Sequence, residues 1–190
     1  MSDIPFSDHT GGVDLRSNYF ELFGIPVGYD VERSAIQPRY LELQRVVHPD
    51  RFAGLGERGQ RLAIQYAAFV NEAFDTLCSP LKRALYLLEV SGHPVDVERN
   101  TVMDAAFLME QMSLREELSE VRDSADPEAA VESVRENAEA MMDALKDEFV
   151  RLWQEGETGY EQAADCARKM HFAEKLLDEA EQLEEEILDS

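Results

Sequence analysis

The chain has 190 residues, of which 44% are hydrophobic and 31% are charged, so it can bury a core as one domain or as two small ones. Its formal net charge of −22 argues against a nucleic-acid-binding protein, because such a protein needs basic residues to replace counterions along the phosphates. The same charge disfavours binding to an anionic membrane surface.

The acidic charge is concentrated in the second half of the chain. Residues 1–96 contain 13 acidic and 9 basic residues, a net charge of −4, whereas residues 97–190 contain 27 acidic and 9 basic residues, a net charge of −18. Two halves with such different surfaces suggest two separate tasks.

The cysteines fit a reducing compartment, and the first residues do not resemble a targeting signal. Residues 1–17 lack the basic start and apolar stretch of a secretory signal, and we expect them to form a short flexible tail. Cys78 and Cys166 lie in helix-like sequence without a CxxC pattern, so neither a disulfide framework nor a structural zinc site is expected. No apolar run approaches the length of a membrane span.

Two helices are expected before residue 50. Residues 18–25 predict a short first helix that ends at Gly24. Asp30 or Ser34 can cap a second helix. Apolar residues of this second helix recur at offsets of four, three and four, which place them on one face: Ile36, Tyr40, Leu43 and Val47.

Prolines set the limits of the second helix. Pro38 removes a backbone donor and clashes with the turn before it, so the helix begins near Gln37 or its first turns are distorted. His48 and Pro49 end the helix, because the residue before a proline avoids the helical region. Residues 52–60 contain three glycines and are expected to form a loop.

Two further helices complete the first half. The third follows the expected loop and carries one apolar stripe: Leu62, Tyr66, Phe69, Ala73 and Leu77. Pro80 opens the fourth helix, which ends near Gly92. Residues 93–100 form the expected linker.

Three helices are expected in residues 101–190. Thr101 can cap the first of them, with Asp104 three residues later. The next two run from about 127 to 154 and from about 160 to 188, each with apolar residues at intervals of three and four. The short connections predict an antiparallel three-helix bundle, and the absence of a strand pattern predicts an all-α fold.

The tripeptide His48-Pro49-Asp50 allows three interpretations: a metal or catalytic site, a plain helix stop, or a docking loop for another protein. A metal site needs further ligands, and no other histidine has an evident link to this one. A catalytic pair needs a nucleophile and a pocket, which the neighbouring sequence does not indicate.

The sequence around this tripeptide resembles the J-domain, in which HPD lies in a loop and the following helix ends in a fixed pattern. The matching residues, in order and spacing, are Val70, Asn71, Ala73, Phe74, Leu77, Pro80, Arg83 and Tyr86. Ser79 departs from the usual Asp or Asn, and Pro38 is a second departure. The resemblance covers about residues 18–88 and implies docking on a DnaK-type chaperone.

The second half resembles HscB, the family of J-proteins of iron–sulfur cluster assembly, in "TVMDAAFLMEQMSLREEL" (101–118) and "AEQLEEEILD" (180–189). The resemblance implies a protein that is no enzyme and needs no cofactor or metal. It implies two partners, the chaperone HscA and the scaffold protein IscU. Because no zinc-binding cysteine pattern occurs near the N-terminus, the chain is similar to bacterial members, and a bacterial cytoplasmic location is expected.

The resemblance implies that the chaperone binds the second helix and its loop, through His48, Pro49, Asp50, Arg39, Arg45 and Arg51. The arginines give this surface positive charge, which suits electrostatic steering. Each arginine taken alone is equally consistent with a solvated face. The Asp50 carboxylate can accept two parallel donors from a chaperone arginine.

The helix expected after residue 101 has two apolar faces when its residues are placed at about 100° per residue. The expected core face consists of Phe107, Leu114, Leu118 and Val121. Leu108, Met109 and Met112 fall on the opposite side, and Glu116 and Glu120 continue that ridge. An apolar patch rimmed by acid indicates a partner site, although a second interpretation is that another helix covers it.

The resemblance favours IscU as the partner of this patch and adds Phe172, which periodicity alone assigns to the core. The sequence therefore predicts a J-domain over residues 18–92, a linker over 93–100 and a three-helix bundle over 101–190. A J-protein for a different client and a helical scaffold without chaperone function remain the alternatives.

Overall fold

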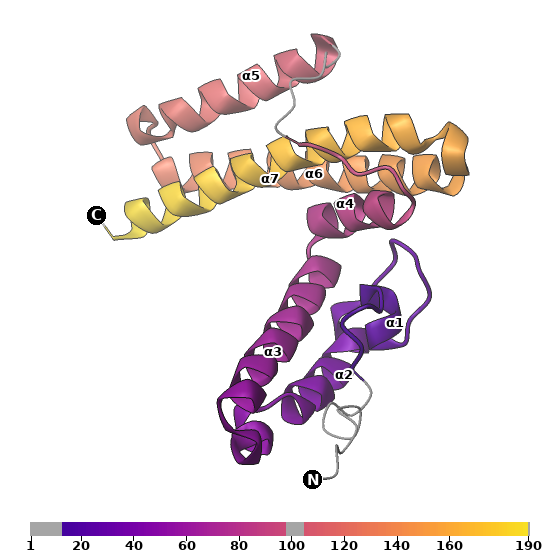
Figure 1. The fold of residues 1–190 in the computed structure, drawn as a ribbon. Helices are drawn as coiled ribbons and strands as arrows, with labels where there is room; N and C mark the ends of the chain where they lie inside the picture. Colours follow the sequence, from indigo (N-terminus) through magenta and orange to yellow (C-terminus); the bar gives the residue numbers. More distant parts are fainter. Residues whose placement is uncertain (1–12, 98–104, 190) are drawn as a thin grey trace. The chain divides into compact units, whose positions relative to one another are not determined.

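The computed structural model of the chain describes residues 13–97 and 105–189. This part of the chain contains helices and turns but no strand, so the predicted all-α fold is confirmed (Figure 1). The chain divides into two compact units between Ser91 and Gly92. Residues 1–12 of the predicted tail, the end of the predicted linker and the predicted cap at Thr101 and Asp104 lie outside the described residues.

The N-terminal unit consists of α1 (Tyr19–Phe23), α2 (Arg33–Val46), the 3-10 helix η2 (Pro49–Leu55), α3 (Gly56–Cys78) and α4 (Pro80–Val90). The predicted first helix is confirmed as α1. The Asn18 side chain accepts the Glu21 N–H, and the Glu21 side chain accepts the Asn18 N–H, which forms a capping box. Gly24 ends the helix in the left-handed region, with φ of 69°.

Helix α2 begins earlier than Pro38 led us to expect. Its N-cap is Glu32, whose side chain makes no capping hydrogen bond, so the predicted caps at Asp30 and Ser34 are wrong. The helix continues through Pro38. Proline cannot donate to the Ser34 carbonyl four residues earlier, but both residues are exposed, so water can solvate that carbonyl.

The loop predicted over residues 52–60 is wrong, because η2 occupies its first part and α3 begins at Gly56. The three glycines did not prevent helix formation. Phe52 is fully buried and fixes η2 against α3, while Gly59 is buried inside the first turns of α3. Burial of the Phe52 side chain contributes about 1.5–3 kcal/mol, which offsets the low helix propensity of the glycines at least in part.

The core of the N-terminal unit lies where α2, η2, α3 and α4 meet. The predicted stripe on α2 is confirmed for Ile36, Leu43 and Val47, whereas Tyr40 is half-buried and stacks on Phe74 with ring centroids 4.0 Å apart. The remaining side chains that are almost completely buried here are Phe20, Ala63, Val70, Ala73, Leu77, Leu81, Ala84, Leu87 and Leu88.

Arg83 carries a buried charge in this unit. Its Nε donates to the Leu77 carbonyl at 2.8 Å, and its Nη1 donates to the Tyr29 carbonyl at 2.6 Å. The guanidinium also lies 5.1 Å from the centre of the Tyr29 ring. Burial lowers the pKa of Arg83 from its ordinary value, and the carbonyl oxygens compensate for part of the lost hydration. One side chain of α4 thus joins the end of α3 to the segment before α2.

Two other positions of the matched pattern act as local anchors. Ser79 caps α4, because its Oγ accepts the Lys82 N–H at 3.2 Å, so serine replaces the usual Asp or Asn in the same capping role. The Tyr86 hydroxyl accepts the Tyr19 N–H at 2.9 Å, and the two rings stack 4.2 Å apart. These contacts fasten α1 to α4.

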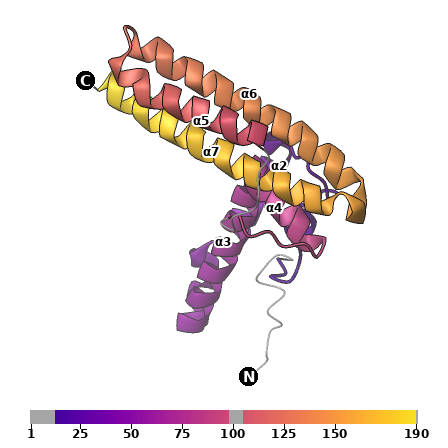
Figure 2. The ribbon, with the colours of Figure 1, turned by 90° about the horizontal axis from the view of Figure 1, so that it is seen from above.

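The C-terminal unit consists of α5 (Ala105–Glu120), the 3-10 helix η3 (Val121–Asp123), α6 (Pro127–Gln154), the 3-10 helix η4 (Gly156–Thr158) and α7 (Tyr160–Leu188). The predicted limits of the last two helices are confirmed. Helices α6 and α7 form a long antiparallel pair with α5 alongside (Figure 2). The turn between them requires glycine, because a Cβ at Gly159 would lie 2.0 Å from the Leu152 carbonyl oxygen.

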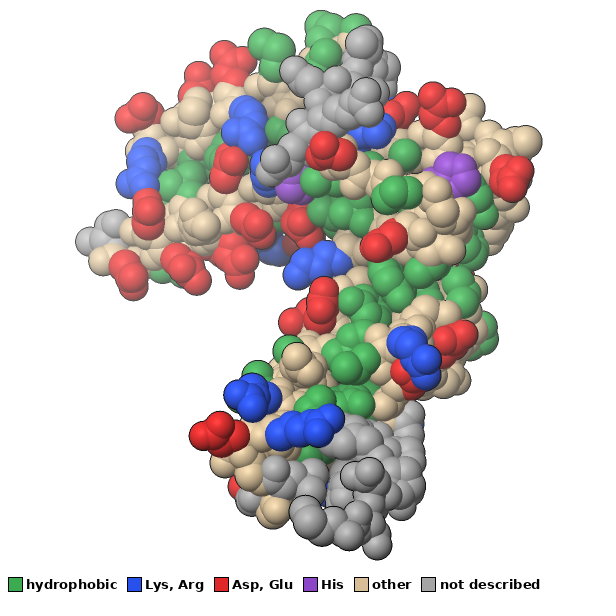
Figure 3. Space-filling view, in the orientation of Figure 1, with side chains coloured by type: hydrophobic (Ala, Val, Ile, Leu, Met, Phe, Trp, Pro, Cys, Tyr) green, Lys and Arg blue, Asp and Glu red, His purple; other side chains and the backbone are tan. Residues whose placement is uncertain are grey.

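Helices α6 and α7 supply most of the buried side chains of this unit. Phe149, Met170 and Leu176 are fully buried between them. Helix α5 adds only Phe107 and Leu114 to the buried set. Acidic side chains gather over the C-terminal part of α7, which agrees with the charge of the second half (Figure 3).

Ion pairs show the direction in which α5 and α7 run. Arg115 pairs with Glu179, and Arg122, just beyond α5 in η3, pairs with Glu186. Both partners advance by seven residues, so the two helices are parallel to each other. Within the described residues, no helix is long and apolar enough to cross a membrane.

We predict that Arg83→Met destabilises the N-terminal unit by about 3–6 kcal/mol, because two buried carbonyls lose hydrogen bonds from a charged donor, each of which contributes about 1.5–3 kcal/mol. Urea unfolding followed by circular dichroism measures the change. Lys82→Met is the matched control, since Lys82 is the exposed neighbour on the same helix, and its effect should stay within about 0.5 kcal/mol. Equal stability of the two variants would contradict the anchoring role of Arg83.

Candidate functional site

The tripeptide at residues 48–50 forms a tight turn between α2 and η2. Val47 ends α2 and is buried, and His48 leaves the helical region with ψ of 134°. Pro49 then opens η2, and the His48 Nδ1 accepts the Asp50 N–H at 3.3 Å. The predicted helix stop at His48 and Pro49 is confirmed, and the histidine itself caps the following turn.

All three residues of this turn are exposed. The Asp50 side chain is 91% exposed, and its Oδ2 lies 3.5 Å from the His48 Nδ1. Since Nδ1 accepts a backbone hydrogen bond, a neutral His48 ring carries its proton on Nε2, which is free to donate outward. The turn therefore presents a carboxylate and a ring N–H to a partner from a backbone that proline restrains.

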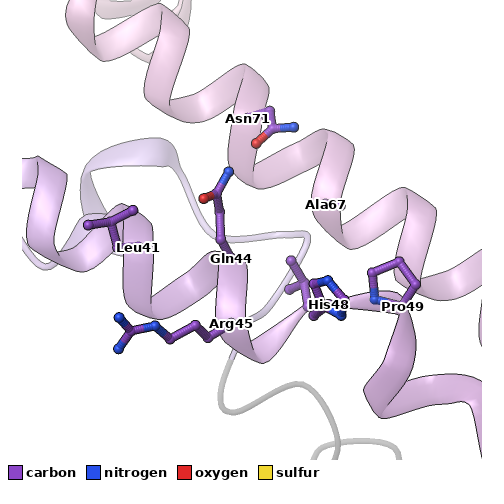
Figure 4. A pocket seen from close by; sticks show the side chains of 8 residues that line it. Leu41, Gln44, Arg45, His48, Pro49, Ala67 and Asn71 are labelled. Carbon is purple, nitrogen blue, oxygen red and sulfur yellow. The ribbon is translucent and has the colours of Figure 1, made fainter.

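A groove with a volume of about 370 Å³ lies beside this turn, between α2 and α3 (Figure 4). Its lining contains no hydroxyl, thiol or carboxylate side chain, so it offers neither a nucleophile nor a metal ligand set. The lining residues are Leu41, Gln44, Arg45, Val47, His48, Pro49, Ala67 and Asn71. The composition fits a surface that receives a partner rather than a catalytic pocket.

Polar side chains hold the two walls of the groove together. The Tyr40 hydroxyl donates to the Asn71 Oδ1 at 3.0 Å and accepts from the Gln44 Nε2 at 2.6 Å. In Figure 4 the Gln44 and Asn71 side chains point toward each other from α2 and α3. This link fixes α2, and with it the turn at residues 48–50, relative to α3.

The three arginines predicted to bind the chaperone are exposed, but their surroundings differ. Arg39 pairs with Glu42 on its own helix at 3.1 Å. Arg45 and Arg51 form no ion pair with any described residue, and Arg45 points away from α3 in Figure 4. Two of the three positive charges are therefore available to a partner without breaking an existing pair.

The two faces predicted for α5 are present. Phe107 and Leu114 are each 6% exposed, whereas Leu108 is 42%, Met109 72% and Met112 70% exposed. Glu116 and Glu120 are exposed beside them. The prediction that the patch lies on the surface is confirmed, and no described helix covers it. We call Leu108, Met109 and Met112 the α5 patch.

Phe172 of α7 has features of both positions considered for it, the core and the partner-binding surface. It is half-buried, and its ring meets the buried Phe107 edge to face, with centroids 6.0 Å apart. The Arg115 guanidinium lies 4.9 Å from the centre of its ring. Phe172 thus contributes one part of its ring to the core and leaves the rest at the surface.

The cysteines offer no reactive site. The Cys166 Sγ is buried and donates to the Leu145 carbonyl at 3.1 Å, and burial raises the pKa of this thiol to about 12. Burial also raises the pKa of Cys78. A neutral thiol is a poor nucleophile and a poor metal ligand. The described residues include no group of three or more His, Cys, Asp or Glu side chains placed to hold a metal.

Comparison with known proteins agrees with both halves of this structure. A family model described as the HSCB C-terminal oligomerisation domain matches residues 103–181. The solved structure of the chaperone HscB from Vibrio cholerae is 38% identical, with a TM-score of 0.77, and the match covers 90% of this chain and 99% of that one. The human co-chaperone HscB is 28% identical, with a TM-score of 0.79 and coverage of 90% and 83%.

The fold and these matches define a class of protein, an all-α co-chaperone with an N-terminal J-like domain and a C-terminal helical bundle. Within that class, the chain belongs to the HscB family.

Two contacts of the candidate surfaces were not predicted from the sequence. The Gln44–Tyr40–Asn71 link was missed because a polar side chain on a helix does not reveal its partner on another helix. The Arg115–Glu179 pair had a detectable signal, since Arg115 and Arg122 are seven residues apart and so are Glu179 and Glu186. Matching seven-residue spacings of opposite charges on two helices of a bundle indicate faces that can form ion pairs, although not the direction of the helices.

Proposed function

We propose that this protein is a co-chaperone of iron–sulfur cluster assembly in the bacterial cytoplasm. Its J-domain stimulates the ATPase of the DnaK-type chaperone HscA, and its C-terminal bundle delivers the scaffold protein IscU. The observation that carries the proposal is the intact turn at residues 48–50, exposed at the end of α2 in a chain of the HscB family. The protein itself makes and breaks no bonds in this proposal.

The turn is suited to bind a positively charged side chain of the chaperone. The exposed Asp50 carboxylate can accept two parallel N–H donors from an arginine, the strongest common geometry for such a pair. Pro49 and the His48 cap restrain the backbone, so little conformational entropy is lost when the partner binds. Val47 and Phe52, both buried, hold the two ends of the turn in the core.

The charge around the turn supports the same partner. Arg45 and Arg51 place unpaired positive charge beside Asp50 in a chain whose net charge is −22. A local basic surface on an acidic protein steers an acidic partner toward one face and away from the others. The arginines contribute mainly to the rate and orientation of docking, and Asp50 contributes specificity.

The α5 patch supports binding of a folded client. Its three side chains are exposed and apolar, and the two methionines adapt to an irregular partner surface. Glu116 and Glu120 lie along one edge and favour a partner with basic residues around an apolar centre. The family resemblance supports IscU as this client.

A second copy of the chain is the other candidate occupant of the α5 patch, because the matched family model is described as an oligomerisation domain. The net charge of −18 on residues 97–190 acts against it, since two such surfaces repel each other. We therefore favour the scaffold protein. Sedimentation at several protein concentrations, without and with IscU, distinguishes the two occupants.

We predict that Asp50→Asn abolishes stimulation of the HscA ATPase and leaves the helix content unchanged, because the side chain is 91% exposed and serves only the partner. Steady-state ATP hydrolysis and circular dichroism are the two measurements. Asp75→Asn, at an exposed aspartate on α3, is the control and should stimulate fully. Normal stimulation by Asp50→Asn would refute the J-domain function.

Docking on HscA should weaken as salt increases, because exposed charges are screened beyond about 8–10 Å at physiological ionic strength. Arg45→Ala and Arg51→Ala should each reduce the dependence of the association rate on salt. Arg39→Ala should change it less, since Arg39 is already paired with Glu42. Surface plasmon resonance at several salt concentrations tests this order, and an association rate independent of salt contradicts it.

Replacing Leu108, Met109 and Met112 together by alanine should weaken IscU binding more than about a thousandfold and leave docking on HscA unchanged. The melting temperature should fall by less than about 5 °C, because the three side chains are exposed. Leu176→Ala is the control for a buried truncation and should cost about 2–5 kcal/mol of stability. Unchanged IscU affinity in a folded triple variant would assign the patch to another partner.

A further inference from the structure

Arg115, which lies next to the α5 patch, contacts α7. It follows Met112 by three residues and Leu108 by seven, so it lies at the border of the patch on the same side of α5. Its Nη1 and Nη2 each donate to one carboxylate oxygen of Glu179, both at 3.1 Å. Two parallel hydrogen bonds hold a planar guanidinium in one orientation.

The same guanidinium lies on the ring of Phe172. Its central carbon is 4.9 Å from the ring centre, a distance at which a cation is attracted by the face of an aromatic ring. Phe172 precedes Glu179 by seven residues, so the ring and the carboxylate lie on one side of α7. The edge-to-face contact with Phe107 restrains the Phe172 ring through a second neighbour.

We propose that Arg115 is a positioning residue that extends the scaffold-binding surface from α5 onto α7. Clamped by Glu179, its guanidinium holds the half-buried Phe172 ring beside Leu108 and Met112, so that a client meets one continuous apolar surface from two helices. The inference rests on the proposed function, in which this surface binds IscU. Arg115 acts through Phe172 and the orientation of α5.

Comparison with the second ion pair between these helices shows how Arg115 differs from Arg122. Arg122 and Glu186 repeat the pairing seven residues further along both helices, and their side chains are 60% and 61% exposed. No aromatic ring of a described residue lies under the Arg122 guanidinium. An ion pair of this exposure contributes little to folding, so Arg122 serves as a control that pairs the same two helices without a ring contact. Arg115 differs in that its guanidinium also lies on an aromatic ring, that of Phe172.

Calorimetric titration of the full chain with IscU tests the proposal. Arg115→Gln should weaken binding about tenfold. Arg115→Lys should weaken it to a similar extent, because an ammonium group cannot make two parallel bonds and stack on the ring. Glu179→Gln, which removes the carboxylate that binds Arg115, should also weaken IscU binding. Arg122→Gln is the control and should change affinity less than twofold.

A double-mutant cycle tests whether Arg115 acts through Phe172. Phe172→Ala should reduce affinity strongly in the wild-type chain and far less in Arg115→Gln, because the ring is already misplaced there. Additive losses would overturn the proposal. So would an Arg115→Gln variant that binds as tightly as the wild type.

Aromatic NMR signals of Phe172 in the free protein give a readout that does not depend on IscU. Arg115→Gln should shift the ring resonances and increase ring mobility, and Arg122→Gln should leave both unchanged. Unaltered Phe172 signals would overturn the positioning role even if affinity fell. A wild-type chain that does not bind IscU would instead overturn the proposed function, whatever the ring measurement shows.

Discussion

The C-terminal unit depends on the antiparallel contact of α6 with α7, because these two helices supply most of its buried side chains. Helix α5 buries Phe107 and Leu114 against that pair, with Leu118 partly buried beside them, and its opposite face stays exposed. A two-helix core therefore leaves a third helix available for binding. Helix α5 has more apolar side chains than it buries, and three exposed ones form the α5 patch.

The N-terminal unit must hold its candidate functional residues in one conformation although they are exposed. Buried neighbours provide that restraint: Val47 on one side of the turn, Phe52 on the other, and the Tyr40–Asn71 hydrogen bond between the walls of the adjoining groove. Arg83 holds the opposite end of the unit together. A restrained backbone beneath exposed polar side chains allows recognition without a large entropic cost.

The sequence predicted the fold where periodicity was strong and failed where one buried contact decided the local structure. The limits of α6 and α7 followed from apolar spacing together with the breaks at Pro127 and at Gly156 and Gly159, and the two faces of α5 followed from apolar spacing. The segment 52–60 did not, because its glycines indicate a loop unless Phe52 is known to be buried. Contacts between helices, such as Arg115 with Glu179, depend on how the helices are aligned, and one helix taken alone does not contain that information.

The two faces of α5 also have an evolutionary consequence. Phe107 and Leu114 are constrained by the fold of their own chain, whereas Leu108, Met109 and Met112 are constrained only by whatever binds them. Under the proposed function, the exposed face can change together with the client while the buried face stays fixed. Residues one position apart, such as Phe107 and Leu108, would then diverge among relatives at different rates and record two separate selective pressures within a single helix.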